Sequence, residues 1–275
     1  MIKWEHSIFV LPFAMTGAML AAGGWPSVSK LAWIIVCMVS ARSAAMAFNR
    51  WADAGIDAAN PRTASRAIPA GQLSRAFVAG FTLTMAAIFI LAASQLNRAA
   101  LLLSPLALAI VLFYSYTKRF TRWSHVFLGL AMGTAPSAAW IAVRGSLDPR
   151  ILLLTGAVLF WGAGFDVLYA CQDFDHDRKV GLHSIPAAIG IPAAFWVSNA
   201  MHAAALVLLV LLVKVFALGA AAWLGIAVVA GLLLYEHLIV SPRDLRRLNA
   251  AFFTMNGVIA ILFFVFVAAD LLWRR

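Results

Sequence analysis

Two groups of carboxylates stand at the ends of long apolar runs, where a charged side chain is costly unless a cation meets it. The first group is Asn49, Asp53 and Asp57, spaced four residues apart, and the second is Asp173 and Asp177, with the same spacing. Residues four apart lie on one face of a helix, so each group predicts a polar stripe at a helix end. Mg²⁺ binds through one or two carboxylates together with phosphate oxygens. The two groups therefore predict a site in which magnesium holds a diphosphate.

Basic side chains accompany both groups. Arg62 and Arg66 follow the first group along the chain, and Lys118 lies in a short basic stretch between the two. Positive side chains beside bound Mg²⁺ neutralise the charge that develops on a departing diphosphate. The fragment that diphosphate leaves behind is a carbocation, which an allylic isoprenoid stabilises by resonance. Its hydrocarbon tail would explain an active site inside a membrane.

Further polar residues lie deeper in the same apolar runs. Asp166 and Tyr169 precede Asp173 at helical spacing, and Arg42 lies seven residues before Asn49 on nearly the same stripe. Arg42 has a second interpretation, as a structural ion-pair partner of Asp166 or a side chain that reaches toward the membrane surface.

The composition indicates that these stripes belong to a membrane protein. Hydrophobic residues make up 64% of the 275 residues and charged residues only 12%, whereas roughly a quarter of a soluble domain is charged. No charged start with a cleavage site precedes the first apolar run, so we expect that run to remain as a span. Windows of about 20 apolar residues predict a single all-α domain, residues 1–275, with nine spans. These spans are 7–24, 29–50, 75–95, 99–117, 123–143, 151–171, 190–213, 217–238 and 250–272.

The distribution of Lys and Arg predicts the orientation. Most basic residues, including Lys3, Arg62, Lys118 and Arg178, fall at one set of helix ends. Because basic loops stay on the cytoplasmic side, we expect both acidic groups and the N-terminus inside and the C-terminus outside, in the inner (plasma) membrane. The formal charge of +10 reflects this bias. The basic residues form no compact domain, so no nucleic-acid partner is expected, and the sequence indicates no obligate protein partner.

The motifs also carry a family resemblance. The patterns Asn-x3-Asp-x3-Asp and Asp-x2-Tyr-Ala-x2-Asp-x3-Asp, with the strings IKWEH, YSYTKRF and GLHSIP, resemble the UbiA superfamily of intramembrane aromatic prenyltransferases. Within it the chain is most similar to the prokaryotic 4-hydroxybenzoate polyprenyltransferases of quinone biosynthesis. The resemblance implies nine helices in a ring around a central cavity that opens to the cytoplasm, with a lateral opening to membrane lipid for the prenyl tail.

The resemblance also implies roles for individual residues. Asp53, Asp57, Asp173 and Asp177 would bind Mg²⁺, and Asn49, Arg62, Arg66 and Lys118 would hold the polyprenyl diphosphate. In the electrophilic aromatic substitution that follows, Asp166 would stabilise the cation or accept the ring proton, and Tyr169 and Tyr114 would add cation–π stabilisation. Arg42 or Lys3 would bind the carboxylate of the aromatic acid. Asp175, between the matched acids, departs from the pattern and is expected in solvent.

Alternatives remain at this point. A dihydroxynaphthoate of the futalosine menaquinone route is a second acceptor, since it is also a carboxylated phenolic ring. In a different class, an ion-coupled transporter would use Arg42, Asp166 and the carboxylate stripes as an ion pathway. A membrane scaffold without chemistry leaves the carboxylates unexplained.

Overall fold

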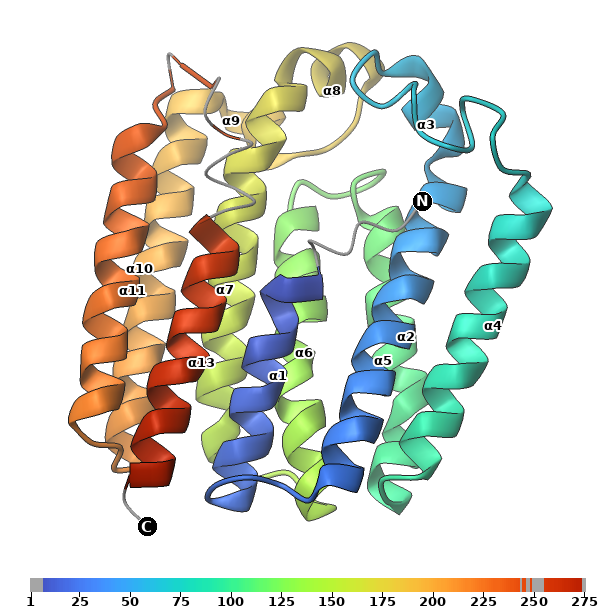
Figure 1. Cartoon of the computed structure of the whole chain (residues 1–275). Coiled ribbons are helices and arrows are strands. Elements are labelled where there is room, and N and C mark those ends of the chain that lie inside the picture. The colour runs from blue at the N-terminus through green and yellow to red at the C-terminus, as the bar shows by residue number, and fades with distance from the viewer. Residues whose placement is uncertain (1–6, 243, 246–247, 249–254, 274–275) are drawn as a thin grey trace.

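The computed structural model describes residues 7–242, 244–245, 248 and 255–273 and is built from helices (Figure 1). Short 3-10 turns, Pro149–Ile151 and Cys171–Asp173, flank the central helix α7. The helices are α1 Ser7–Ala22, α2 Val28–Ala52, α3 Ala54–Ala59, α4 Arg75–Ser94, α5 Arg98–Thr117, α6 Ser124–Arg144, α7 Leu152–Ala170, α8 Phe174–Val180, α9 Ile185–Ile189, α10 Ile191–Val215, α11 Ala220–Ile239 and α13 Asn256–Trp273.

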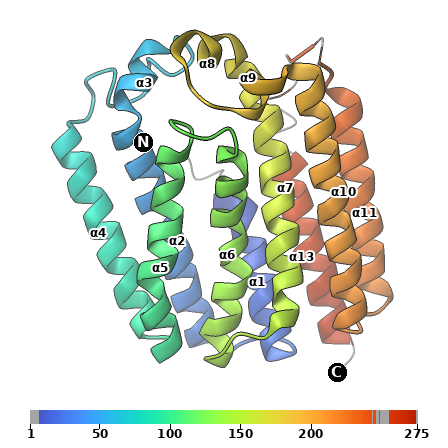
Figure 2. The same ribbon diagram turned by 180° about the vertical axis from the view of Figure 1, so that it is seen from behind.

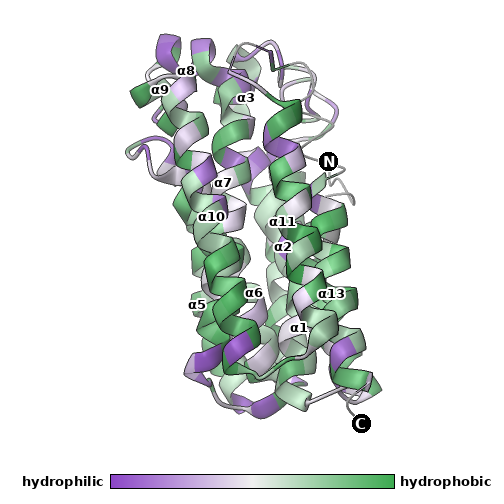
Figure 3. Ribbon diagram, turned by 90° about the vertical axis from the view of Figure 1, so that its left-hand side faces the viewer, coloured by the Kyte–Doolittle hydropathy of each residue, from purple (hydrophilic) through white to green (hydrophobic). Residues whose placement is uncertain are grey.

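Eight segments of the described chain are long and apolar enough to cross a membrane; they contain α2, α4, α5, α6, α7, α10, α11 and α13. Hydrophilic residues gather at the two ends of these helices and apolar residues between them (Figure 3). The predicted all-helical, multi-pass architecture is therefore confirmed. The one remaining expected span, 7–24, corresponds to α1, which has 16 residues. At 1.5 Å per residue α1 covers about 24 Å, less than the ~30 Å hydrocarbon core of a bilayer.

Polar caps and glycines set the helix ends locally. The side chains of Ser74 and Asn97 accept hydrogen bonds from the backbone N–H groups of Phe77 and Ala100, at 3.1 and 2.9 Å. These bonds satisfy donors that have no partner within the first helical turn. At the other end α6 stops at Gly145, whose φ of 74° is the left-handed conformation that glycine adopts without strain.

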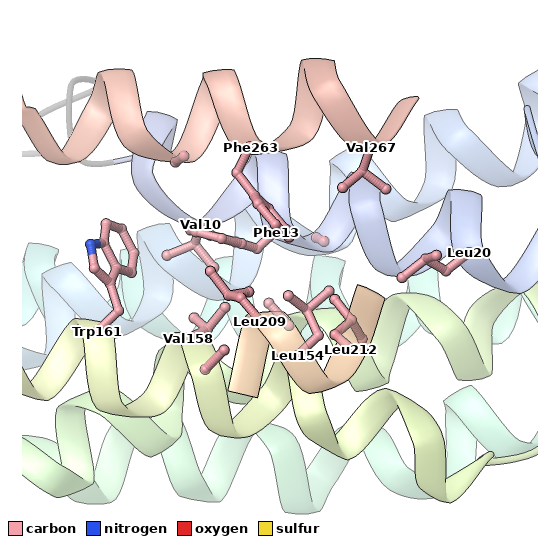
Figure 4. Close-up of a cluster of buried hydrophobic side chains, with 14 of the residues drawn as sticks. Val10, Phe13, Leu20, Leu154, Val158, Trp161, Leu209, Leu212, Phe263 and Val267 are labelled. Atoms are coloured by element: carbon pink, nitrogen blue, oxygen red, sulfur yellow. The ribbon is translucent and has the colours of Figure 1, made fainter. Parts of the chain in front are cut away.

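The long helices form two groups that share α1 and α6. Helices α7, α10, α11 and α13 pack with α1 around the main hydrophobic core, whereas α2, α4 and α5 pack together on the other side of α6. Figure 4 shows Phe13, Val158, Leu209 and Phe263 meeting in this core from α1, α7, α10 and α13. Because α1 packs directly against α6, the space among the helices lies on the α2, α4 and α5 side.

Small residues allow α6 and α7 to touch backbone to backbone. A methyl group placed on Gly129 would overlap the carbonyl oxygen of Leu159, and one placed on Gly133 would lie 2.6 Å from the carbonyl oxygen of Thr155. Neither position has room for a larger side chain, so the small-x3-small pair in the sequence marks a close helix contact, as this spacing predicts.

The segments expected as polar loops after the second and sixth spans contain short helices. Helix α3 follows α2, and α8 and α9 follow α7, at the same end of the molecule (Figures 1 and 2). The backbone N–H of His183 donates to the carbonyl oxygen of Lys118 at 2.9 Å, which ties the segment after α8 to the connection between α5 and α6. The sequence predicts no helix here because helices of five to seven residues carry too few apolar positions to show a period.

Candidate functional site

The first acidic group continues the helical path of α2. Asp53 is the residue at which α2 ends and α3 begins, and its N–H still donates to Asn49 O at 2.9 Å, while Asp57 N donates to Asp53 O at 2.8 Å. The side chains therefore keep their common face, and Asn49 Nδ2 donates to Asp53 Oδ2 at 3.1 Å. Asp53 and Asp57 are only 1% and 3% exposed. Two carboxylates at this depth need positive partners.

Residues after α3 join the first group to the second. Arg62 Nε donates to Asp173 Oδ1 at 2.8 Å, its Nη2 donates to Asp173 Oδ2, and Asn60 Nδ2 donates to Asp173 Oδ1 at 3.0 Å. Burial disfavours the charge of Arg62, but the hydrogen bonds and charge of Asp173 outweigh it and raise the pKa of the guanidinium. Arg62 Nη1 also lies 3.3 Å from the hydroxyl of Tyr169. The segment that follows the first acidic group is thus tied to Asp173 of the second group.

The remaining basic side chains pair with the first group. Lys118 Nζ lies 2.6 Å from Asp53 Oδ2, Arg119 Nη2 lies 3.0 Å from Asp53 Oδ1, and Arg66 Nη1 lies 2.6 Å from Asp57 Oδ1. Each cation has between 28% and 31% side-chain exposure, far more than the acid it meets. Acidic and basic groups therefore alternate around one region whose cations remain accessible to an anion.

The carboxylate oxygens of this region include one that suits a metal ion. Asp57 Oδ2 is buried and has no hydrogen-bond partner, so it is available as an oxygen ligand. Among the described residues, no three His, Cys, Asp or Glu side chains converge as a ready-made metal cluster. Mg²⁺ usually takes only one or two carboxylates and completes its shell with water and phosphate oxygens. The carboxylates present fit that pattern.

A cavity of about 720 Å³ extends from this region between the helices. Residues of α1, α2, α4, α5, α6 and α7 line it, and most are apolar. It reaches from Tyr169 to Leu152 along α7, a length of about 26 Å at 1.5 Å per residue. Its lining includes the charged side chains of Arg42, Arg50, Arg66 and Asp166, whereas the polar residues Ser104, Thr134, Ser137 and Thr155 carry only hydroxyl groups. The space can therefore hold a long apolar molecule with a polar head.

Several predicted site residues have neighbours that differ from the expectation. Arg42 lines the cavity, its Nε is buried without a hydrogen-bond partner, and it forms no ion pair with Asp166. Asp166 Oδ2 instead lies 2.7 Å from His125 Nδ1. The interpretation of Arg42 and Asp166 as an ion pair was therefore wrong, because His125 on α6 is the closer partner.

The outermost predicted residues are placed as follows. Asp177 lines a second, more open pocket of about 610 Å³, together with Arg122 and His183. Asp175 is exposed, as expected. Lys3 lies outside the described residues.

Three residues of the site were missed by reasoning from the sequence. Arg119 follows the predicted Lys118 directly, and Asn60 lies one turn beyond Asp57, so their positions in the same polar segments were available signals. His125 has no metal-ligand spacing in the sequence, which favours a packing or interfacial role. Nothing in the sequence connects it to Asp166, which is 41 residues away on the neighbouring helix.

Comparisons with known proteins identify the family of the chain. The family model of the UbiA prenyltransferase family matches residues 10–267. The chain is 29% identical over 255 residues to 4-hydroxybenzoate octaprenyltransferase of Vibrio cholerae, covering 92% of this chain and 88% of that protein. It is 33% identical over 247 residues to 4-hydroxybenzoate octaprenyltransferase of Pseudomonas fluorescens, covering 89% and 83%.

Solved structures show the same fold. The apo structure of a UbiA homologue from Aeropyrum pernix K1 matches with a TM-score of 0.89 and 35% identity, covering 98% of this chain and 99% of that one. A UbiA homologue from Archaeoglobus fulgidus, bound to DMAPP and Mg²⁺, matches with a TM-score of 0.72 and 19% identity, covering 96% and 95%. The family match spans nearly the whole chain and confirms the resemblance seen in the motifs. The chain belongs to the UbiA prenyltransferase family.

Proposed function

We propose that this chain transfers a polyprenyl group from a polyprenyl diphosphate to the ring carbon ortho to the hydroxyl of 4-hydroxybenzoate, in quinone biosynthesis. The observation that carries the proposal is the bridge from Asn60 and Arg62 to Asp173, which ties the segment after the first acidic group to the second group. Arg62 also contacts Tyr169, which lines the apolar cavity. The Vibrio and Pseudomonas relatives are named 4-hydroxybenzoate octaprenyltransferases, which supports this acceptor and a long donor.

The charged region would hold the diphosphate. Asp53, Asp57, Asp173 and Asp177 would bind Mg²⁺ with the diphosphate oxygens, and Asn49 would orient Asp53 through its amide. Mg²⁺, when bound, supplies charge neutralisation for the leaving diphosphate. Arg62, Arg66 and Lys118 would exchange part of their contact with the carboxylates for contact with the diphosphate, which their exposure permits.

The prenyl tail would occupy the cavity. The bond from C1 to the diphosphate oxygen breaks with both electrons going to the diphosphate, and the ring carbon of the acceptor forms a bond to C1. The ring proton then leaves to a base. Asp166 and Tyr169 line the cavity close to the charged region, so Asp166 would face the cation and take the proton, while Tyr169 would stabilise the cation.

The carboxylate of the acceptor needs a cation of its own. Arg42 lies in the cavity with its Nε unpaired, so it suits this role; Lys3 stays a candidate from the sequence alone. We further propose α1 as the ninth span and a cavity that opens to the cytoplasm. The basic residues at the α3 and α8 end support this orientation through the positive-inside rule.

An acceptor screen tests the proposal. Purified protein in lipid nanodiscs receives octaprenyl diphosphate and Mg²⁺ with either 4-hydroxybenzoate or a dihydroxynaphthoate, and products are identified by mass spectrometry. We expect a C-prenylated 4-hydroxybenzoate. Exclusive use of the naphthoate would assign the chain to menaquinone synthesis, and ion flux in liposomes without turnover of either acceptor would indicate a transporter.

A further inference from the structure

His125 connects two parts of the site that come from different helices. It lies at the start of α6, is 3% exposed, and places Nδ1 2.7 Å from Asp166 Oδ2 on α7. On its other side, Nε2 accepts a hydrogen bond from the backbone N–H of Ile185 at 3.2 Å. Ile185 is the first residue of α9, in the segment that follows the second acidic group.

These two contacts determine the tautomer of His125. A backbone N–H can only donate, so Nε2 must carry the lone pair and the proton of the neutral ring must be on Nδ1. Nδ1–H then donates to Asp166. Because Nε2 is already bonded and the ring is enclosed, His125 is poorly placed to accept a proton itself.

The surrounding packing holds this arrangement in place. Gly129, one turn after His125, brings α6 against the backbone of α7 near Leu159, and Gly162 of α7 lies against Met132 and Gly129. Ser184 caps α9 by accepting from Ala187 N at 3.3 Å, which fixes the N–H of Ile185 next to it. Both partners of the imidazole are thus on rigid elements.

We propose that His125 is a positioning residue for Asp166, which it orients toward the cavity through the Nδ1–H bond. The inference rests on the proposed function, since it assumes that Asp166 faces the carbocation. With Oδ2 bound to His125, the carboxylate plane is fixed and Asp166 keeps 20% side-chain exposure, in a cavity where its charge can oppose the cation. Without this bond the carboxylate is free to turn toward Arg42, which lines the same cavity.

Two substitutions separate the two hydrogen bonds. In His125→Asn the amide nitrogen stands where Nδ1 was, so the donor to Asp166 is kept and the acceptor for Ile185 is lost. In His125→Gln the amide lies one carbon further out, so its oxygen reaches Ile185 and the donor to Asp166 is lost. Both variants bury an amide of similar size and polarity, which makes each the control for the folding of the other.

The measurement is kcat and KM for prenyl transfer, with thermal stability in detergent measured on the same preparations. We expect kcat to fall roughly 10- to 100-fold in His125→Gln, since a hydrogen bond to a charged group is lost, and by less than about 5-fold in His125→Asn. KM for the prenyl diphosphate should be unchanged in both, because the diphosphate contacts lie elsewhere. Equal kcat losses in the two variants at equal stability, or wild-type kcat in His125→Gln, would overturn the role of His125.

The wild-type protein separates this inference from the proposed function. Wild-type protein that transfers no prenyl group to any acceptor overturns the proposed function. Wild-type protein that is active, with variants that show no difference between Asn and Gln, overturns only the positioning role.

Discussion

The contact between α6 and α7 gives a prediction whose size follows from the structure. In Gly133→Ala the new methyl group would lie 2.6 Å from Thr155 O and 3.3 Å from Leu159 Cβ. A carbon–oxygen contact normally measures about 3.3 Å or more, so the helices must separate locally by roughly 0.7 Å. Such overpacking costs about 1–3 kcal/mol, whereas the replacement of glycine by alanine in a helix gains only about 0.4–1 kcal/mol. The overpacking term equals or exceeds this gain, so we expect a net destabilisation of up to ~2.6 kcal/mol.

The assay is the free energy of unfolding in mixed micelles, followed by titration with a denaturing detergent. Gly80→Ala is the matched control, since Gly80 is also inside a long helix, α4, and a methyl group there meets nothing within 4 Å. We expect Gly80→Ala to be neutral or slightly stabilising. If Gly133→Ala is as stable as Gly80→Ala, the close packing of α6 on α7 is refuted.

Two further predictions concern the substrate. Arg62→Ala removes two hydrogen bonds to Asp173 and should raise KM for the prenyl diphosphate roughly 10- to 100-fold. The control is Arg98→Ala, at the exposed first residue of α5, which is the opposite end of that helix from Lys118; equal effects of the two substitutions would contradict the role of Arg62. Ala138→Trp places an indole in the cavity. We expect kcat/KM for octaprenyl diphosphate to fall at least ~10-fold while geranyl diphosphate is still used, because the indole displaces part of the longer tail and each buried CH₂ that the tail loses costs ~0.8 kcal/mol. Ala87→Trp, at an exposed position of α4 that does not line the cavity, should leave both donors unaffected.

The sequence predicts the elements and the polar stripes well because both depend on local periodicity. The eight long spans, the common face of Asn49 and Asp53, and the close contact at Gly129 and Gly133 all follow from spacing along one helix. The charged residues at the helix ends are likewise predictable, because their sign and position can be read from one segment of the sequence at a time.

Contacts between helices are less accessible from the sequence. The partner of Asp166 depends on which helix lies beside α7 and at what height, and a single sequence gives no signal for His125. The position of the cavity also depends on contacts between helices. Helix α1 packs on α6, helices α10, α11 and α13 lie on the core side, and none of their described residues lines the cavity. The ring of helices that the family resemblance implies does not distinguish these two halves.

The most direct test of the account is whether both acidic groups are needed for one magnesium-dependent reaction. Prenyl transfer by the purified protein is measured with Mg²⁺ and with excess EDTA, for wild type, Asp53→Ala, Asp173→Ala and the exposed control Asp175→Ala. We predict that turnover requires Mg²⁺, is lost in both Asp53→Ala and Asp173→Ala, and persists in Asp175→Ala. Turnover in EDTA, or an active Asp173→Ala, would contradict the claim that the two groups jointly hold the diphosphate.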